Sequence, residues 1–335
     1  MDKNVINIIK ELLDNHKRII ILTHANPDGD AIGSSLALYS ILIQEKHNVS
    51  IITPNEFPSF LAWMPYTNNI LVHKNNKKKV SEAIKAADII FCLDFNDVKR
   101  MEAIEEDYLK SGAVKIMIDH HISSDVYTDY SISNTYTSST SELIYDLIAD
   151  LNKAHLINKE VAECLYVGIV TDTGSFSYAC NYEKTYLIIA ELFKHGIDGE
   201  HIHRLVYDTY TEDRMRLLGY CLSEKLRVFP KYHTAYISLT KEDMNKFNYK
   251  IGDTEGIVNY GLSIESIDLA ALFMERDGCI KISLRSKGGV SVNDIARKYY
   301  SGGGHHNAAG GNSYISMEKT LAEFEAILPV IFSNK

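Results

Sequence analysis

One short stretch of the sequence combines an imidazole with two carboxylates, namely His24, Asp28 and Asp30. It follows an apolar run, Ile19–Thr23, and precedes a helical pattern, so a buried strand would end in a loop that carries all three groups. Because Gly29 separates them, the two carboxylates can point to different sides, as two neighbouring metal ions would require. Taken alone, the same residues would also suit a surface turn with a helix cap.

Further groups able to bind metal follow other apolar segments. Asp94 comes after the run 88–93, and Asp119, His120 and His121 come after 114–118. Ligands collect at the carboxyl ends of the strands in open parallel sheets, so these groups are expected to meet at one edge. Asp172 ends an apolar helical pattern, where a carboxylate is costly to bury unless it caps a turn or faces a cation. With the other clusters present, the cation is the preferred interpretation.

A glycine-rich segment in the last part of the chain is a candidate anion site. Gly302, Gly303 and Gly304 have no side chains, so their backbone N–H groups can approach an anion closely. Arg285, at the end of a predicted strand, can make a bidentate phosphate contact, and Ser286 adds a hydroxyl donor. The alternative for the glycines alone is a flexible loop between a helix and a strand.

The elements that would position these groups alternate between strands and helices in the first half. The expected strands read as continuous apolar runs, which indicates a sheet covered on both faces, and the alternation predicts a doubly wound parallel α/β domain. The expected strands are 19–23, 49–53, 88–94 and 114–118, and the expected helices are 5–16, 31–45, 80–87, 139–151 and one that starts after Asn158. The basic segment 74–79 is expected to be a solvated loop.

The second half changes from helices to a β-rich texture. Residues 181–195 form another helix closed by Gly196, and helices within 199–227 would connect two domains. Strands at 232–239, 267–273 and 279–285, followed by helices at 293–300 and 317–328, indicate a smaller α/β domain with a mixed sheet. Pro329 is expected to end the last helix.

The length, net charge and cysteine content of the chain argue against several classes of protein. The 335 residues suggest two domains, and a formal charge of −9 argues against a broad grip on long nucleic acid, though not against a short nucleotide in a local pocket. The five cysteines are scattered and odd in number, which indicates reduced thiols in a cytoplasmic protein. The N-terminus reads as an amphipathic helix, and no run of about 18 apolar residues is present, so neither a signal peptide nor a membrane span is expected.

The order of all these motifs resembles the DHH–DHHA1 phosphoesterase family along essentially the whole chain, and most of all its stand-alone oligoribonuclease and pAp phosphatase branch. The resemblance implies a DHH catalytic domain at 1–195, a helical linker at 196–228 and a substrate-gripping DHHA1 domain at 229–335. It also implies two Mn²⁺ ions, with Mg²⁺ or Co²⁺ as substitutes.

The same resemblance implies roles for individual residues. One ion would be held by His24, Asp28 and Asp94, and the second by Asp30, Asp94, His120 and Asp172, with Asp94 bridging. Asp119 would orient His120 from behind, and Asp119, His120 and His121 would form the catalytic motif. The substrate contacts would come from Arg100, His121, Arg285, Ser286, Gly302, Gly303, Gly304 and His305.

The implied activity is hydrolysis of short oligoribonucleotides such as pApA to nucleoside monophosphates, and of 3′-phosphoadenosine 5′-phosphate (pAp) to AMP. The expected partners are short RNA and nucleotides, not long double-stranded nucleic acid or a membrane, with a homodimer through the DHH domain. Two alternatives stay open: a stand-alone cyclic di-AMP phosphodiesterase, and a nucleotide sensor that does not cut. A turnover assay on these substrates separates them.

Overall fold

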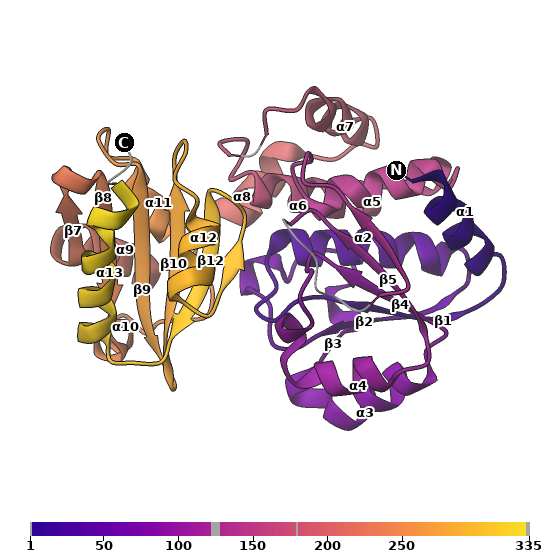
Figure 1. The fold of residues 1–335 in the computed structure, drawn as a ribbon. Helices are drawn as coiled ribbons and strands as arrows, with labels where there is room; N and C mark the ends of the chain where they lie inside the picture. Colours follow the sequence, from indigo (N-terminus) through magenta and orange to yellow (C-terminus); the bar gives the residue numbers. More distant parts are fainter. Residues whose placement is uncertain (1, 122–127, 179, 333–335) are drawn as a thin grey trace. The chain divides into compact units, whose positions relative to one another are not determined.

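The computed structural model describes residues 2–121, 128–178 and 180–332, which divide into two compact units, Met1–Thr209 and Tyr210–Lys335 (Figure 1). The division falls inside the linker expected at 196–228. The domain boundaries that we gave from the sequence stay a prediction.

The first unit is built on a six-stranded sheet with the order β3-β2-β1-β4-β5-β6. Every neighbouring pair in it is parallel. Its central strands are continuous apolar runs that are buried on both faces, as the sequence pattern predicted. The strands are β1 (Arg18–Leu22), β2 (Asn48–Thr53), β3 (Ile70–Val72), β4 (Ile89–Leu93), β5 (Val114–Asp119) and β6 (Tyr130–Ser133).

Helices cover both faces of this sheet, which confirms the doubly wound α/β prediction (Figure 1). In Figure 1, α3 and α4 lie below the sheet, whereas α2, α5 and α6 lie above it. The helices of this unit are α1 (Lys3–Leu12), α2 (Gly29–Gln44), α3 (His73–Ala86), α4 (Glu105–Lys110), α5 (Thr140–Asp150), α6 (Lys159–Asp172), α7 (Glu183–Phe193) and α8 (Gly199–Tyr207). Short 3₁₀ segments add Ser59–Leu61, Thr67–Asn69, Val98–Ile104 and Ala154–Leu156.

The second unit has its own six-stranded sheet, with the order β11-β12-β10-β9-β8-β7. This sheet is mixed as expected, because β8 and β9 run parallel and the other pairs are antiparallel. The strands are β7 (Leu226–Phe229), β8 (Thr234–Leu239), β9 (Leu269–Arg276), β10 (Cys279–Ser286), β11 (Gly303–Gly304) and β12 (Ala308–Ser313).

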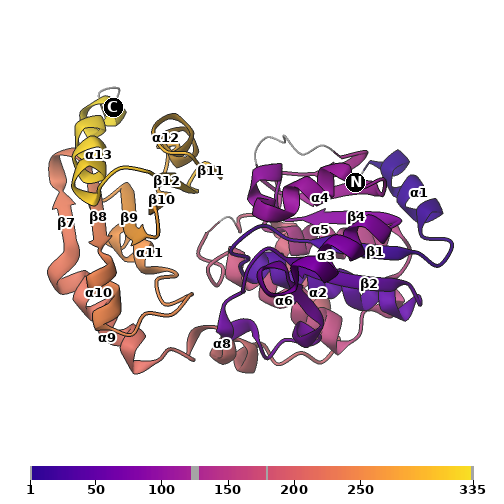
Figure 2. The ribbon, with the colours of Figure 1, turned by 90° about the horizontal axis from the view of Figure 1, so that it is seen from below.

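Separate hydrophobic clusters cover the two faces of the second sheet. Helices α12 and α13 pack on one face, and α9, α10 and α11 pack on the other; Figure 2 shows α12 and α13 on the opposite side from α10 and α11. The helices are α9 (Glu212–Tyr220), α10 (Lys241–Lys246), α11 (Ile257–Leu262), α12 (Val292–Tyr299) and α13 (Met317–Phe332). A π-helical turn (Cys221–Lys225) and a 3₁₀ turn (Pro230–Tyr232) flank β7.

Several elements differ from expectation. We predicted a loop at 74–79, and this prediction was wrong, because the segment belongs to the first part of α3, which has a kink at Asn76. The lysines of this segment are exposed, and lysine is a good helix former. The expected stop at Pro329 was also wrong. Helix α13 continues to Phe332, because Leu328 is buried and Phe332 packs against the core, which offsets the one hydrogen bond that proline cannot donate. We did not predict the short edge strands β3 and β6 from the sequence.

No helix in the described part of the chain combines the length and the apolar character that crossing a membrane requires.

Candidate metal centre

His24 lies just past β1 and is buried, with 3% of its surface exposed. Its Nδ1 is 2.9 Å from the Ala25 carbonyl, which can only accept, so Nδ1 carries the proton. In the neutral ring, Nε2 therefore presents a lone pair, and it has no hydrogen-bond partner among the described residues. This lone pair faces two carboxylates, with 3.5 Å to Asp94 Oδ2 and 3.9 Å to Asp28 Oδ2. Acceptors that converge in this way need a cation or a proton between them.

Asp28 satisfies both interpretations that its sequence position allowed. Its Oδ1 caps α2 by accepting from the backbone N–H groups of Asp30 and Ala31, at 3.1 and 3.0 Å. Its Oδ2 is left to face His24. One carboxylate thus caps a helix and also offers an oxygen to the same space.

A second group of donors lies on the other side of Asp94. His120 Nε2 is 3.4 Å from Asp172 Oδ2, 3.5 Å from Asp94 Oδ1 and 3.8 Å from Asp30 Oδ2. His120 and Asp30 are buried, whereas the side chain of Asp172, at the end of α6, is 26% exposed. Both groups of donors are compact enough to surround one ion each.

Asp94 belongs to both groups, because its Oδ2 faces His24 and its Oδ1 faces His120. Its backbone has φ +66°, a left-handed conformation that costs a non-glycine residue of the order of 1 kcal/mol or more. Asp94 directly follows β4, so this conformation turns the chain sharply where the strand ends. The strain is compatible with a site that fixes the direction of one carboxylate.

The crowding of carboxylates changes the protonation of the buried groups. Burial raises the pKa of Asp30 well above its ordinary value, and the charges of Asp94 and Asp172 raise it further. Burial lowers the pKa of His120, but the carboxylates of Asp172, Asp94 and Asp30 outweigh it and raise that pKa to about 10. Burial also raises the pKa of Asp94, but the neighbouring imidazoles of His120 and His24 hold it well below the usual carboxyl value. Without metal, the carboxylates of this centre therefore need bound protons or another positive charge to offset their mutual repulsion.

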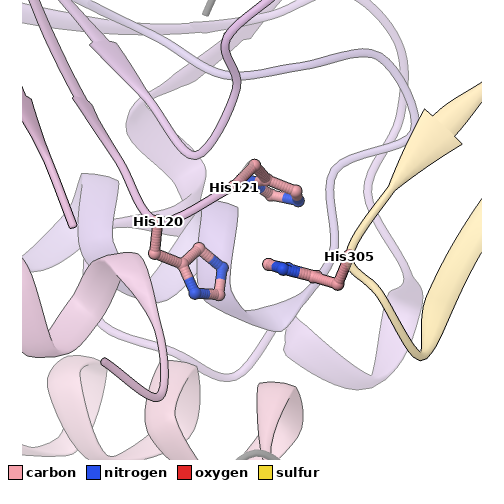
Figure 3. Close-up of side chains that lie close together, drawn as sticks. All are labelled: His120, His121 and His305. Atoms are coloured by element: carbon pink, nitrogen blue, oxygen red, sulfur yellow. The ribbon is translucent and has the colours of Figure 1, made fainter. Parts of the chain in front are cut away.

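Asp119 and His121 form a pair beside this centre. His121 Nδ1 is 2.7 Å from Asp119 Oδ1, and the backbone N–H of His121 donates to Oδ2. Asp119 therefore orients the imidazole of His121, and the role that we expected for it toward His120 stays a prediction. The two rings, drawn in Figure 3, belong to the residues that directly follow β5, and their centroids are 4.9 Å apart. A carboxylate behind an imidazole fixes its tautomer and direction.

Close helix packing brings the donors on α2 and α6 together. A Cβ on Gly33 of α2 would lie 2.5 Å from the carbonyl oxygen of Cys164 on α6. A Cβ on Gly168 of α6 would lie 1.8 Å from Ser141 Oγ and 2.8 Å from Asp30 Oδ1. These glycines therefore let the two helices approach at the depth where Asp30 and Asp172 must meet.

The first turn of α5 is a part of the candidate metal centre that we did not predict from the sequence. The backbone N–H groups of Thr140 and Ser141 donate to Asp30 at 2.6 and 2.8 Å, and the Thr140 hydroxyl donates to Asp94 at 3.0 Å. The available signal was the run of hydroxyl residues 137–141 directly before a predicted helix, which we treated only as a helix start.

Arg100 lies near the same centre. Its Nη1 is 3.5 Å from the backbone oxygen of Asp94, and its own carbonyl accepts from the N–H of Ala25. The guanidinium is partly exposed, so it places a cation beside the loop that carries His24.

The candidate substrate residues of the second unit gather around β10 and the β11–β12 turn. Gly303 and Gly304 form β11, so the glycines are part of a small hairpin rather than of an irregular loop. Gly304 has φ +147°, and a Cβ there would lie 2.6 Å from the Ala308 carbonyl oxygen, so glycine is required at this position. His305, labelled in Figure 3, is carried by the turn between β11 and β12.

Arg285 and Ser286, two of the predicted substrate contacts in this unit, differ in how exposed they are. Arg285 is partly exposed at the end of β10, and its Nη1 donates to the Leu284 carbonyl. Ser286 is buried, and its hydroxyl donates to the Val290 carbonyl at 2.6 Å. Its hydroxyl thus helps to hold the β10–α12 loop, and the substrate contact that we expected of Ser286 stays a prediction.

Comparisons with known proteins agree with this arrangement. The N-terminal domain of the DHH family matches residues 18–169, and the DHHA1 domain matches residues 230–328. The chain belongs to the DHH/DHHA1 family of phosphoesterases. It is therefore a hydrolase of phosphoester bonds, as predicted.

Individual members of the DHH/DHHA1 family resemble the chain along nearly all of its length. The bifunctional oligoribonuclease and PAP phosphatase NrnA of Bacillus subtilis is 31% identical, over 92% of this chain and 94% of that protein. A probable NrnA of Streptococcus mutans is 33% identical, over 92% of both chains. The crystal structure of an exopolyphosphatase-related protein from Bacteroides fragilis shares 43% identity and superposes with a TM-score of 0.92, over 98% of both chains.

The domain matches of this DHH/DHHA1 protein contain most of the residues described above. His24, Asp94 and His120 lie within the DHH match, and Arg285 and His305 lie within the DHHA1 match. Asp172 lies just beyond residue 169, where the DHH match ends, and reaches the centre only because α6 continues to it.

Proposed function

We propose that this phosphoesterase hydrolyses short oligoribonucleotides such as pApA to nucleoside monophosphates, and pAp to AMP, at a pair of Mn²⁺ ions. The observation that carries the proposal is the position of Asp94, whose two oxygens each face a separate set of buried donors. One set is His24, Asp28 and Asp94, and the other is Asp30, Asp94, His120 and Asp172. The activities by which the NrnA relatives are named, oligoribonuclease and PAP phosphatase, support the substrate class.

The donor chemistry of these sets fits manganese. Imidazole nitrogen combined with carboxylate oxygen suits Mn²⁺ better than Mg²⁺, which prefers oxygen ligands and keeps its water. The lone pair of His24 Nε2, held toward two carboxylates, is the feature that a proton or a metal must satisfy. Co²⁺ and Mg²⁺ are the substitutes that we expect to work less well or at higher concentration.

The bound ions would supply a hydroxide at neutral pH and a clamp for the phosphoryl oxygens. The chain's own residues orient and neutralise the substrate. Asp119 holds His121 through Nδ1, and His121 would contact the phosphate through its ring. Arg100 and Arg285 offer guanidinium groups for the remaining phosphate charge, and the backbone of Gly302–Gly304 with His305 binds the nucleotide.

The substrate is expected to be short. A net charge of −9 gives little electrostatic hold on a long strand, which needs many cationic contacts to phosphates. A length series from dinucleotides to long oligomers tests this expectation. Faster cleavage of the long oligomers would contradict it.

A panel of four substrates tests the proposal directly. Release of nucleoside monophosphate from pApA, and of phosphate from pAp, should require Mn²⁺ and exceed turnover of cyclic di-AMP. Polyphosphate belongs in the panel because a similar structure is called exopolyphosphatase-related. Preferred hydrolysis of cyclic di-AMP or polyphosphate would replace the substrate assignment, and binding of pApA without turnover would make the chain a sensor.

Two further expectations concern the location of the protein and its oligomeric state. The described cysteines are all free and mostly buried, which fits the reducing cytoplasm that we propose as the location. The homodimer through the DHH domain comes only from the family resemblance. Sedimentation analysis of the full chain tests it, and a monomer at micromolar concentration would exclude it.

A further inference from the structure

The first turn of α5 contacts both central carboxylates of the candidate metal centre. Thr140 donates from its backbone N–H to Asp30 Oδ2 at 2.6 Å and from its hydroxyl to Asp94 Oδ1 at 3.0 Å. Ser141 adds its backbone N–H to Asp30 Oδ1 at 2.8 Å. Thr140 and Ser141 are fully buried, and Asp30 and Asp94 are nearly so. One helix start thus holds a carboxylate from α2 and a carboxylate that follows β4.

The two carboxylates are held in different ways. Both oxygens of Asp30 accept backbone N–H groups from the helix start, where such donors lack partners within the helix. Any non-proline residues at positions 140 and 141 could provide these bonds. The bond to Asp94 needs a side-chain hydroxyl at position 140. The identity of this residue therefore matters for Asp94 and not for Asp30.

The hydroxyl of Thr140 has no role in capping the helix. Ser139 is the cap, because its Oγ accepts from the backbone N–H of Glu142 at 3.1 Å. The Thr140 hydroxyl instead contacts Asp94 Oδ1, the same oxygen that faces His120 at 3.5 Å and His121 at 3.7 Å. A donor on one side of this oxygen leaves its other lone pair for a cation.

We propose that Thr140 is a positioning residue for the bridging carboxylate, which it holds in the rotation that presents one oxygen to each group of donors. This inference rests on the metal centre of the proposed function. Without this hydroxyl, the Asp94 carboxylate loses the donor that lies 3.0 Å from its Oδ1, and both candidate ion positions lose a fixed ligand. Partners that orient a metal ligand typically change metal affinity by about 10–100-fold when they are removed.

The test compares three variants of the full-length protein after metal removal. Thr140→Val keeps the side-chain shape and the backbone N–H but lacks the hydroxyl, whereas Thr140→Ser keeps the hydroxyl. Thr185→Val is the matched control, because Thr185 is fully buried and its hydroxyl donates at 2.8 Å to Glu142, a buried carboxylate outside the centre. Titration calorimetry with Mn²⁺ alone gives the affinity and the number of ions, and thermal unfolding with and without Mn²⁺ gives the stabilisation by metal.

We expect Thr140→Val to weaken Mn²⁺ binding by about 10–100-fold and to reduce the rise in Tm that Mn²⁺ causes. Thr140→Ser should stay within about threefold of the wild type, and Thr185→Val should bind Mn²⁺ as the wild type does even where its metal-free Tm is lowered. Wild-type Mn²⁺ affinity and stoichiometry in Thr140→Val would overturn the inference.

Two further outcomes are interpreted separately: a wild-type protein that binds no Mn²⁺, and a Thr140→Val variant that does not fold. If the wild-type protein itself binds no Mn²⁺, the proposed function fails, whatever Thr140 does. If Thr140→Val does not fold, Thr140→Ala decides by the same measurement, because it also lacks the hydroxyl and adds no bulk. Wild-type binding by Thr140→Ala would then overturn the inference.

Discussion

A carboxylate that is shared between two ions must present one oxygen to each of them, and Asp94 has this orientation for reasons that can be traced to single residues. Its left-handed backbone turns it away from β4, and the Thr140 hydroxyl contacts one of its oxygens. Its other oxygen faces the Nε2 lone pair of His24. The centre therefore depends on Asp94 more than on any donor that faces a single ion position.

Asp94→Asn should remove one charged ligand from both positions while it keeps the side-chain volume. We expect Mn²⁺ affinity and turnover of pApA each to fall by at least about 100-fold, because a neutral amide oxygen is a much poorer ligand and the amide nitrogen is none. Calorimetry with Mn²⁺ and an assay of AMP release measure the two effects. The control is Asp88→Asn, at the other end of the strand and paired with Arg18, which should change neither. Normal turnover in Asp94→Asn would exclude a bridging role.

Metal binding should release protons. The raised pKa of His120, about 10, means that this ring is an imidazolium at neutral pH in the metal-free protein. Because a metal needs the lone pair at Nε2, binding displaces that proton, and Mn²⁺ affinity should rise by about tenfold per pH unit for each proton released between pH 7 and 9. Calorimetry in buffers of different ionisation enthalpy counts the protons. His120→Asn should release about one proton fewer, and affinity independent of pH would contradict the assignment.

At the scale of elements, the distance between α2 and α6 decides whether Asp30 and Asp172 meet. Gly168→Ala would place a Cβ against Ser141 and Asp30, which cannot move without disturbing α5. We expect the free energy of unfolding to fall by about 1–3 kcal/mol despite the better helix propensity of alanine, and Mn²⁺ binding to weaken. Denaturant unfolding and calorimetry measure this. Gly219→Ala, in α9 with open space around the added Cβ, should be neutral or slightly stabilising. A Gly168→Ala variant that is as stable as Gly219→Ala and binds Mn²⁺ as the wild type does would refute the packing argument.

The glycine hairpin of the second unit depends on α12. The N–H of Gly304 donates to the buried Asn293 Oδ1 at 2.9 Å, and Arg297 Nε approaches the same oxygen at 3.4 Å. Asn293→Ala removes this acceptor and loosens the hairpin. A hydrogen bond worth about 1 kcal/mol predicts an increase in KM for pApA of roughly fivefold, with Mn²⁺ affinity unchanged. The neighbouring exposed Asp294→Asn should leave KM as it is, and an unaltered KM in Asn293→Ala would show that the hairpin does not bind substrate.

The elements that the sequence predicted well are those with long apolar runs. The strands β1, β2, β4 and β5 agree with expectation within one residue at each end, because their burial on both faces leaves an unbroken apolar signal. The edge strands β3 and β6 are too short to carry such a signal. The continuation of α13 past Pro329 depends on tertiary packing of Phe332, which local sequence rules do not contain.

The residues of the candidate site also fall into those that could be predicted from the sequence and those that could not. His24, Asp28, Asp30, Asp94, His120 and Asp172 could be brought together from the sequence because each lies shortly after a strand or at one end of a helix. The contact between Asp119 and His121 was not predicted, since His120 and His121 are adjacent and the sequence does not say which ring faces the carboxylate. Thr140 was overlooked because a threonine at a helix start has an ordinary explanation.

At the scale of the whole molecule, the candidate metal donors and the residues proposed to bind substrate in the second unit belong to different compact units. The hydrophobic clusters of the first unit lie within residues 5–207, and those of the second lie within residues 217–332. The candidate metal donors all belong to the first unit, whereas Arg285 and His305 belong to the second. Metal binding and substrate binding are therefore expected to be separable.

A fragment that ends at Thr209 tests this separation. Because it contains its complete core, it should fold and bind Mn²⁺ with an affinity close to that of the full chain. Turnover of pApA should fall by at least about 100-fold, since phosphate contacts by charged groups each contribute about 1.5–3 kcal/mol. Circular dichroism, calorimetry and the AMP assay measure the three properties. A folded fragment without Mn²⁺ affinity, or with full turnover, would contradict the division.

The central claim is that two ions share Asp94 in the first unit, and anomalous diffraction at the manganese edge from crystals soaked in Mn²⁺ tests it most directly. The account predicts two peaks about 3.5–4 Å apart on either side of Asp94. One peak should touch His24 and Asp28, and the other should touch Asp30, His120 and Asp172. A single peak away from Asp94, or no peak among these residues in crystals of active protein, would contradict the account.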